Sequence, residues 1–230
     1  MLRKRTLLKQ QQPAGDINTV LLLHLDGSVV DSSMYAVPVS QSSGSSFATG
    51  KFGQSFVGYF LEEASTPSPI ITPSGYMNNV IASDFTIEMW IDSNSIDPMH
   101  GATLFYIGVD ESFKNMTLSA LISDVGGSPL SRIFSIMENI DGMQTPLMDC
   151  FYPISNYPGW FHFAITVSGT ILRMFVNGVI IGTYSNYGEN NDPTFTNSLL
   201  CPTTTKIDEI RISNIARWTA NFTPPTAPYA

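Results

Sequence analysis

The sequence predicts an all-β fold, an antiparallel two-sheet sandwich of jelly-roll type. Short apolar runs separated by turn residues recur along most of the 230 residues, which is typical of sandwiches and barrels. No stretch long enough for a stable helix shows a convincing helical period. The chain ends in a strand, a turn with Trp218, and a tail carrying Pro224, Pro225 and Pro228. Because proline has no amide donor, this tail cannot continue a central strand, and we expect it to cross the outside of the finished sandwich.

The expected strands are apolar runs bounded by Gly, Pro, Asn or Asp. They are residues 20–25, 85–92, 103–109, 116–122, 132–138, 160–167, 171–176, 179–184 and 207–213. Residues 85–92 alternate apolar and polar side chains, which predicts a half-buried strand. Asn177-Gly178 lies between two apolar runs, and both residue types tolerate positive φ, so this pair predicts a tight hairpin. Gly50 and Gly53 predict a bend before residues 54–57.

The charge distribution divides the chain into an N-terminal arm, residues 1–16, and a body, residues 17–230. The arm holds four basic residues: Arg3, Lys4, Arg5 and Lys9. Beyond the first nine residues, the other seven basic residues face all nineteen acidic ones, which leaves residues 10–230 at −12 within a total of −8. Nucleic-acid binding requires cations against phosphates, so the body disfavours it. The arm suits electrostatic docking to a partner.

Neither an export signal nor a membrane helix is expected. Residues 1–16 begin basic but lack the apolar run of a secretory signal, and no segment reaches about 18 consecutive apolar residues. Cys150 and Cys201 are the two cysteines. Since two cysteines in a domain of this size are no disulfide scaffold, free thiols are favoured over a bridge.

Five motifs, in this order, resemble laminin-G-like domains, which have the concanavalin-A-like jelly-roll fold. They are Leu21–Gly27 with Asp31–Ser33, Lys51–Gly53, Asp84–Trp90, Trp160–Ala164 with Phe175–Val179, and Ile207–Ser213 with Ala216–Trp218 and Phe222–Pro225. The resemblance covers residues 18–230, and its last motif is similar to such domains in bacteriophage structural proteins. Because this fold hosts lectins, glycanases, adhesion modules and virion parts alike, the resemblance implies the fold more firmly than the function.

Catalysis is not expected. Glycanases on this fold use carboxylates that share one face of a strand and flank the glycosidic bond. Glu88 and Asp92 share a face but have no carboxylate between them, whereas Asp208 and Glu209 are adjacent and should point to opposite faces. The histidines are scattered without partners for a triad or a metal centre: they are His24, His100 and His162.

The resemblance also implies a structural calcium ion, held in such domains by acidic residues near the first and last strands with backbone carbonyls. The matching residues here are Asp26 and Asp208. Lys206 stands close to Asp208 and disfavours a cation. In the alternative interpretation Asp26 starts a turn and Asp208 pairs with Arg211 or Arg217.

Two loops carry aromatic rings beside amide and carboxylate groups, the combination that binds sugars. The candidate glycan-binding residues are Tyr157, Trp160, Asn186, Tyr187 and Asp192. The hairpins between the loops could bring them to one end of the sandwich. The alternative is that Tyr157 and Trp160 pack in the core and that residues 185–192 form a polar loop.

These observations favour a non-enzymatic structural or adhesion protein of a bacteriophage particle, displayed on capsid or tail, assembled in the host cytoplasm and anchored in part by the arm. Its partners would be other virion proteins, further copies of itself and a host-surface glycan. The alternative is a free carbohydrate-binding lectin module.

Overall fold

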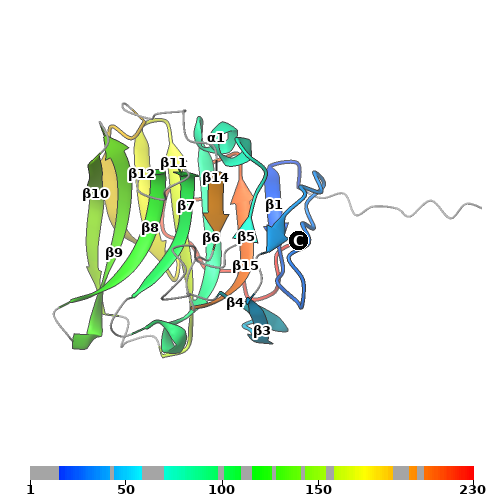
Figure 1. Ribbon diagram of the computed structural model, residues 1–230. Coiled ribbons are helices and arrows are strands. Elements are labelled where there is room, and N and C mark those ends of the chain that lie inside the picture. The colour runs from blue at the N-terminus through cyan, green and yellow to red at the C-terminus, as the bar shows by residue number, and fades with distance from the viewer. Residues whose placement is uncertain are drawn as a thin grey trace, which may run out of the picture.

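The computed structural model is a sandwich of two antiparallel sheets, which confirms the predicted fold class (Figure 1). It describes residues 16–41, 44–58, 70–97, 101–109, 116–125, 128–140, 143–153, 158–188, 197–200 and 205–230. Sheet A has eight strands in the order β13-β12-β11-β6-β15-β4-β3, with β1 also paired to β15. Sheet B has seven, in the order β10-β9-β8-β7-β14-β5-β2.

Sheet A contains six of the predicted strand segments: 20–25, 85–92, 160–167, 171–176, 179–184 and 207–213. Its strands are β1 (Thr19–Leu23), β3 (Ser46–Thr49), β4 (Gln54–Val57), β6 (Phe85–Asp92), β11 (Trp160–Ser168), β12 (Ile171–Val176), β13 (Val179–Ser185) and β15 (Lys206–Ser213). The predicted Asn-Gly hairpin joins β12 to β13, with φ of 49° at Asn177 and 75° at Gly178. The predicted bend before β4 is closed by a hydrogen bond from the Gly50 amide to the Gly53 carbonyl.

Sheet B combines the three predicted central strands with the ten-residue strand β10 and three short strands, none of which the sequence pattern revealed. The strands of sheet B are β2 (Ser40–Gln41), β5 (Ile70–Ile71), β7 (Ala102–Val109), β8 (Met116–Val125), β9 (Ser128–Ile140), β10 (Met143–Tyr152) and β14 (Asn197–Leu200). A short helix, α1 (Tyr76–Ile81), and a 3₁₀ turn, η1 (Ser93–Ser95), complete the elements. Helix α1 buries Met77, Val80 and Ile81 in the core.

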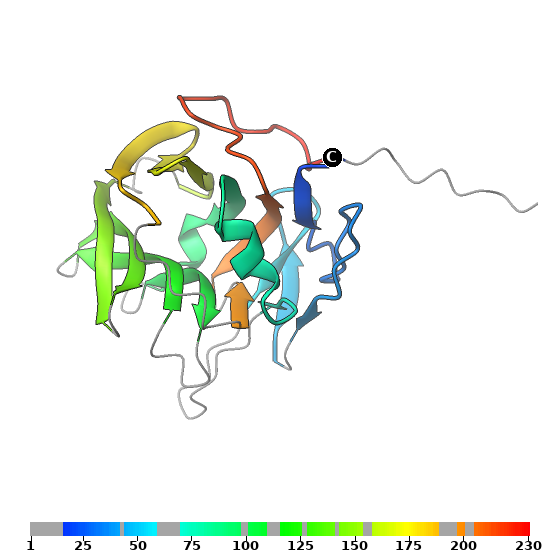
Figure 2. The ribbon, with the colours of Figure 1, turned by 90° about the horizontal axis from the view of Figure 1, so that it is seen from above.

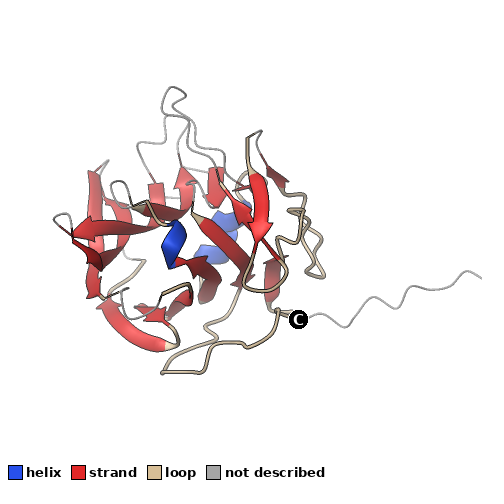
Figure 3. Cartoon of the chain, turned by 90° about the horizontal axis from the view of Figure 1, so that it is seen from below, coloured by secondary structure: helices blue, strands red, loops and turns tan. Residues whose placement is uncertain are grey.

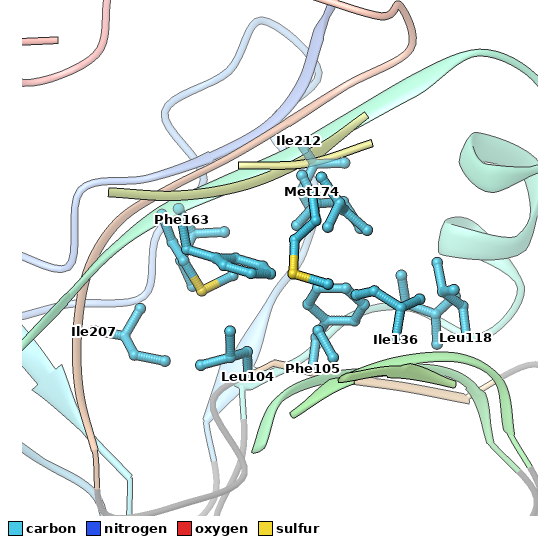
Figure 4. Packing of buried hydrophobic residues seen from close by; sticks show 14 of the residues in the cluster. Leu104, Phe105, Leu118, Ile136, Phe163, Met174, Ile207 and Ile212 are labelled. Atoms are coloured by element: carbon cyan, nitrogen blue, oxygen red, sulfur yellow. The ribbon is translucent and has the colours of Figure 1, made fainter. Parts of the chain in front are cut away.

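The core lies between the sheets (Figure 4). Leu104, Phe105, Leu118 and Ile136 of sheet B face Phe163, Met174, Ile207 and Ile212 of sheet A, and all eight are almost fully buried. Each buried side chain of this size contributes about 1.5–3 kcal/mol to the free energy of unfolding. The buried residues form one continuous cluster that extends in sequence from Val20 to Ile212.

The C-terminal segment, residues 214–230, crosses the outside of sheet A as predicted (Figures 2 and 3). It bonds to β6 and β11 where Thr86 and Thr166 donate to the carbonyls of Ile215 and Trp218. It then reaches the β12–β13 turn, where the Phe222 amide donates to the Gly178 carbonyl. Because this segment covers the outer face, all of β6 is buried, and the half-buried pattern predicted for residues 85–92 is wrong.

Candidate functional site

The outer face of sheet A carries a buried charged network centred on Glu88. Its Oε1 accepts from Arg211 Nε at 2.8 Å and lies 2.7 Å from Nη2. Its Oε2 lies 3.3 Å from His162 Nε2 and accepts from Trp218 Nε1 at 3.3 Å. Burial opposes ionisation of Glu88, but the hydrogen bond from His162 and the charge of Arg211 outweigh it and lower the pKa of the carboxyl.

Tyr229, in the C-terminal segment, packs over this network on the outer face of sheet A. Its backbone amide donates to Glu209 Oε2 at 2.9 Å, and its hydroxyl lies 2.8 Å from His162 Nε2. The guanidinium carbon of Arg211 lies 4.2 Å from the centre of the Tyr229 ring, a cation–π contact. Tyr229 is thus held by three side chains of sheet A.

A bulge in β15 corrects the prediction that Asp208 and Glu209 point to opposite faces. The register slips between Asp208 and Arg211, and Glu209 adopts φ of 51°, which turns both carboxylates to the outer face. Asp208 accepts from the Phe52 amide, and Glu209 lies 2.8 Å from His24 Nδ1. Both residues are fully buried, so they do not form a glycanase pair open to substrate.

Glu88 and Asp92, the other carboxylate pair, also serve the fold. Glu88 is fully buried under the C-terminal segment. Asp92 caps the 3₁₀ turn η1 by accepting from the Asn94 amide, and it lies 3.7 Å from Lys206 Nζ. Of the histidines, His24 and His162 belong to these structural networks, and His100 lies outside the described residues.

The two predicted calcium ligands, Asp26 and Asp208, both bind the backbone of one turn, residues 50–54. Asp26 Oδ1 accepts from the Gln54 amide at 2.6 Å, and Asp208 Oδ2 accepts from the Phe52 amide at 2.9 Å. The expected pairing of Asp208 with an arginine is wrong, because Arg211 binds Glu88 and Arg217 binds Asp16.

Asp208 Oδ1 is buried without a hydrogen-bond partner, which fits a cation ligand. Burial, with the charge of Glu209, raises the pKa of Asp208 to about 7. Within the described ranges, however, no group of three or more Asp, Glu, His or Cys side chains could hold a metal ion. Calcium at this turn would therefore need backbone carbonyls, and it stays a prediction.

The predicted glycan-binding residues do not meet. Trp160 begins β11 opposite Asp92, whereas Ser185 ends β13 opposite Ile171, which follows the other end of β11. Because three antiparallel strands separate the two loops, they leave from opposite ends of sheet A.

The individual residues also differ from a sugar site. Tyr187 is 4% exposed and packs edge-on against Phe85, so its ring cannot stack on a sugar. Trp160 is half-buried, and Asn186 is exposed in the turn after β13. Tyr157 and Asp192 lie outside the described residues. The interpretation of these loops as one glycan site is therefore wrong for the residues that the structure places.

The outer face of sheet B presents polar and aromatic side chains that the sequence reasoning missed. Thr103, Leu121, Ser135 and Asp149 are cross-strand neighbours on β7 to β10. Ser135 Oγ donates to Asp149 Oδ1 at 2.6 Å, and Phe151, two residues further along β10, is 68% exposed. In β10 the alternation of inward and outward residues is interrupted, because Leu147 and Met148, at a bulge, are both buried. A period of two in the sequence therefore does not reveal this face.

Two further predictions can be placed. Cys150 is a free thiol, buried where β10 approaches β13, and burial raises its pKa; Cys201 lies outside the described residues. In the part of the chain that the structure describes, no helix has the length and apolar character needed to cross a membrane.

The sequence of residues 67–220 matches the family described as the concanavalin A-like lectin/glucanases superfamily, Laminin_G_3. The chain belongs to this superfamily. The match covers most of the sandwich, from β5 through β15. No curated protein sequence matches the chain.

Solved structures with the same fold include the binding domains of several toxins. The binding domain of botulinum neurotoxin DC in complex with SialylT superposes with a TM-score of 0.63 at 17% identity, covering 87% of this chain and 48% of that one. A structure of botulinum neurotoxin type C, whose cell entry depends on two ganglioside molecules, gives 0.60 at 19%, covering 86% and 48%.

The binding domain of Paraclostridial Mosquitocidal Protein 1 gives a TM-score of 0.59 at 17% identity, covering 86% of this chain and 49% of that one. This chain therefore spans about half the length of each of these structures. At these identities the similarity establishes the fold.

Proposed function

We propose that this concanavalin A-like domain is a non-catalytic adhesion module that binds a cell-surface carbohydrate. The observation that carries this proposal is the unequal covering of the two sheets. The outer face of sheet A is sealed by the C-terminal segment, which buries Glu88, Glu209 and His162. The outer face of sheet B keeps half-buried or exposed Tyr106, Leu121, Ser135, Asp149 and Phe151.

A binding role follows from how the carboxylates are used. General acid–base chemistry on a sugar needs carboxyl groups within reach of the glycosidic bond. Glu88, Asp208 and Glu209 are fully buried in bonds that hold the C-terminal segment or the 50–54 turn. A face with aromatic rings, hydroxyls and a carboxylate offers the groups that bind a sugar. Membership in a superfamily of lectins and glucanases and the ganglioside dependence of a neighbour support carbohydrate as the ligand.

A glycan array with the purified chain, followed by an assay for released reducing ends on every glycan bound, tests this function. Binding without release is expected. Release of reducing ends by the wild type would instead establish a glycanase, and the absence of binding to any glycan would overturn the carbohydrate ligand.

We further propose that the module is carried on a bacteriophage particle, with residues 1–16 helping to fasten it to capsid or tail. The opposite charges of arm and body support this, although Arg3, Lys4, Arg5 and Lys9 lie outside the described residues. The last residue of the arm, Asp16, is attached to the sandwich, because it forms an ion pair with Arg217 and accepts hydrogen bonds from Asn18 and Thr19. Deleting residues 1–15 should release the protein from particles, and unchanged attachment would contradict the anchoring role.

A further inference from the structure

We infer that the outer edge of sheet B, at Phe151, Asp149 and Ser135, is a binding site for an uncharged saccharide. This inference rests on the proposed function and names the residues and ligand class that serve it. Phe151 is the aromatic residue with the highest exposure among the described large apolar side chains, at 68%. Cys150, next to Phe151, and Met148, three residues before it, are buried in the core. The strand that carries the Phe151 ring is therefore well packed on its inner side.

The exposed ring supplies a stacking surface. The C–H face of a pyranose is apolar and packs on an aromatic ring, while the hydroxyls at its rim need acceptors and donors. Phe151 and Asp149 are two residues apart on one strand, so they share a face at a separation of about 7 Å. A sugar that stacks on Phe151 can therefore place its hydroxyls at Asp149.

Asp149 is oriented to accept those hydroxyls. The Ser135 hydroxyl, on the neighbouring strand β9, donates to Asp149 Oδ1 at 2.6 Å. The exposed carboxylate is thus fixed from one side, which lowers the entropy cost of binding. Ser135 and Leu121 continue the same cross-strand row toward Thr103, giving a surface of alternating polar and apolar groups beside the ring.

Charge decides the class of sugar. Asp149 contributes a carboxylate, and residues 10–230 together carry −12. Among the basic side chains that the structure describes, Lys51, Lys206, Arg211 and Arg217 make their contacts on the sheet A side, to Trp90, Asp92, Glu88 and Asp16; the side chain of Arg132 on β9 lies outside that description. A carboxylate about 4 Å from Asp149 would weaken binding roughly fivefold even in water. Neutral hexoses are therefore favoured over sialylated ones, unlike the ligand of the neurotoxin DC complex.

The test is a glycan array of matched neutral and sialylated oligosaccharides, lactose and sialyllactose among them, followed by titration of the best neutral binder. We expect the wild type to prefer the neutral member of each pair by about fivefold. Phe151→Ala should weaken binding about tenfold, Phe151→Tyr should retain it, and Asp149→Asn should narrow the gap between neutral and sialylated partners. Tyr35→Ala, which removes an exposed ring elsewhere, is the matched control and should change nothing.

The outcomes separate the two proposals. Glycan binding by the wild type that survives in Phe151→Ala would overturn this site and leave the proposed function standing. A preference for sialylated glycans would overturn the ligand class. The absence of binding to any glycan would overturn both.

Discussion

The ring of His162 and the hydroxyl of Tyr229 are joined by a buried hydrogen bond of 2.8 Å that spans 67 residues of sequence. His162 stands on β11, in the middle of sheet A, and Tyr229 is the penultimate residue. The same imidazole nitrogen lies 3.3 Å from Glu88 Oε2. Tyr229 is therefore part of the polar network of sheet A, and removing its side chain should affect the stability of the entire sandwich.

Tyr229→Ala should lower the free energy of unfolding by about 3–5 kcal/mol, because a buried aromatic side chain and its cavity are lost together. Tyr229→Phe should cost about 1 kcal/mol, since only the hydrogen bond to His162 is removed. Urea denaturation measures both. Thr226→Ala, at an exposed position of the same segment, is the control and should stay within about 0.5 kcal/mol of wild type. Equal stability of Tyr229→Ala and wild type would show that the segment is not docked.

Glu88→Gln should destabilise the protein by about 3–5 kcal/mol near neutral pH, because it leaves Arg211 buried without a counter-charge. The pH dependence should change as well. Since the folded state lowers the pKa of Glu88 below 4.5, its contribution is present above pH 4.5 and is lost as pH falls through the folded value. Unfolding free energies measured between neutral and acidic pH should therefore fall less steeply in Glu88→Gln than in wild type. Parallel curves would contradict the assignment.

Alanine substitutions at two glycines that flank β12 distinguish the cost of backbone strain from the cost of a clash with the C-terminal segment. Gly169 and Gly178 both have positive φ, 59° and 75°. A Cβ at Gly169 meets nothing within 4 Å, whereas a Cβ at Gly178 would overlap the Phe222 carbonyl. Gly169→Ala should cost about 1 kcal/mol from strain alone. Gly178→Ala should cost at least about 1 kcal/mol more, since the segment must also move, and equal losses in thermal unfolding would place the segment elsewhere.

Calcium binding at the 50–54 turn should be visible as a shift in thermal stability. If Asp26 and Asp208 hold the ion, about 10 mM calcium should raise the melting temperature relative to a chelator, because binding to the folded state alone adds to stability. Asp208→Asn should abolish the shift. Identical melting curves of the wild type with calcium and with chelator would show that the two carboxylates serve the turn alone.

Much of the fold could be predicted from the sequence because its signals are local. Apolar runs bounded by turn residues place β6, β11, β12 and β13 within a residue of their observed bounds. The Asn177-Gly178 turn follows from the tolerance of both residues for positive φ. The order of family motifs then indicates the sandwich, and the prolines indicate that the C-terminal segment runs outside it.

The site could not be predicted because it depends on long-range geometry. The bulge turns Glu209 to the same face as Asp208, and an analysis of strict two-residue alternation in the sequence cannot detect such a bulge. The burial of Glu88 depends on a segment more than 120 residues away. The loops at Trp160 and Asn186 were paired by composition, although an odd number of strands separates them. Strands of two to four residues, such as β2, β5 and β14, are too short to show a period.

If the C-terminal segment covers sheet A and the ligand binds on the outer face of sheet B, the two faces should respond differently to a bound sugar. Backbone amide chemical-shift mapping with the best neutral oligosaccharide distinguishes them. We expect perturbations concentrated in β8, β9 and β10 around Asp149 and Phe151, with little change at Tyr229 or Trp218. Perturbations concentrated at Trp160, at Asn186 or along residues 214–230 would contradict this expectation.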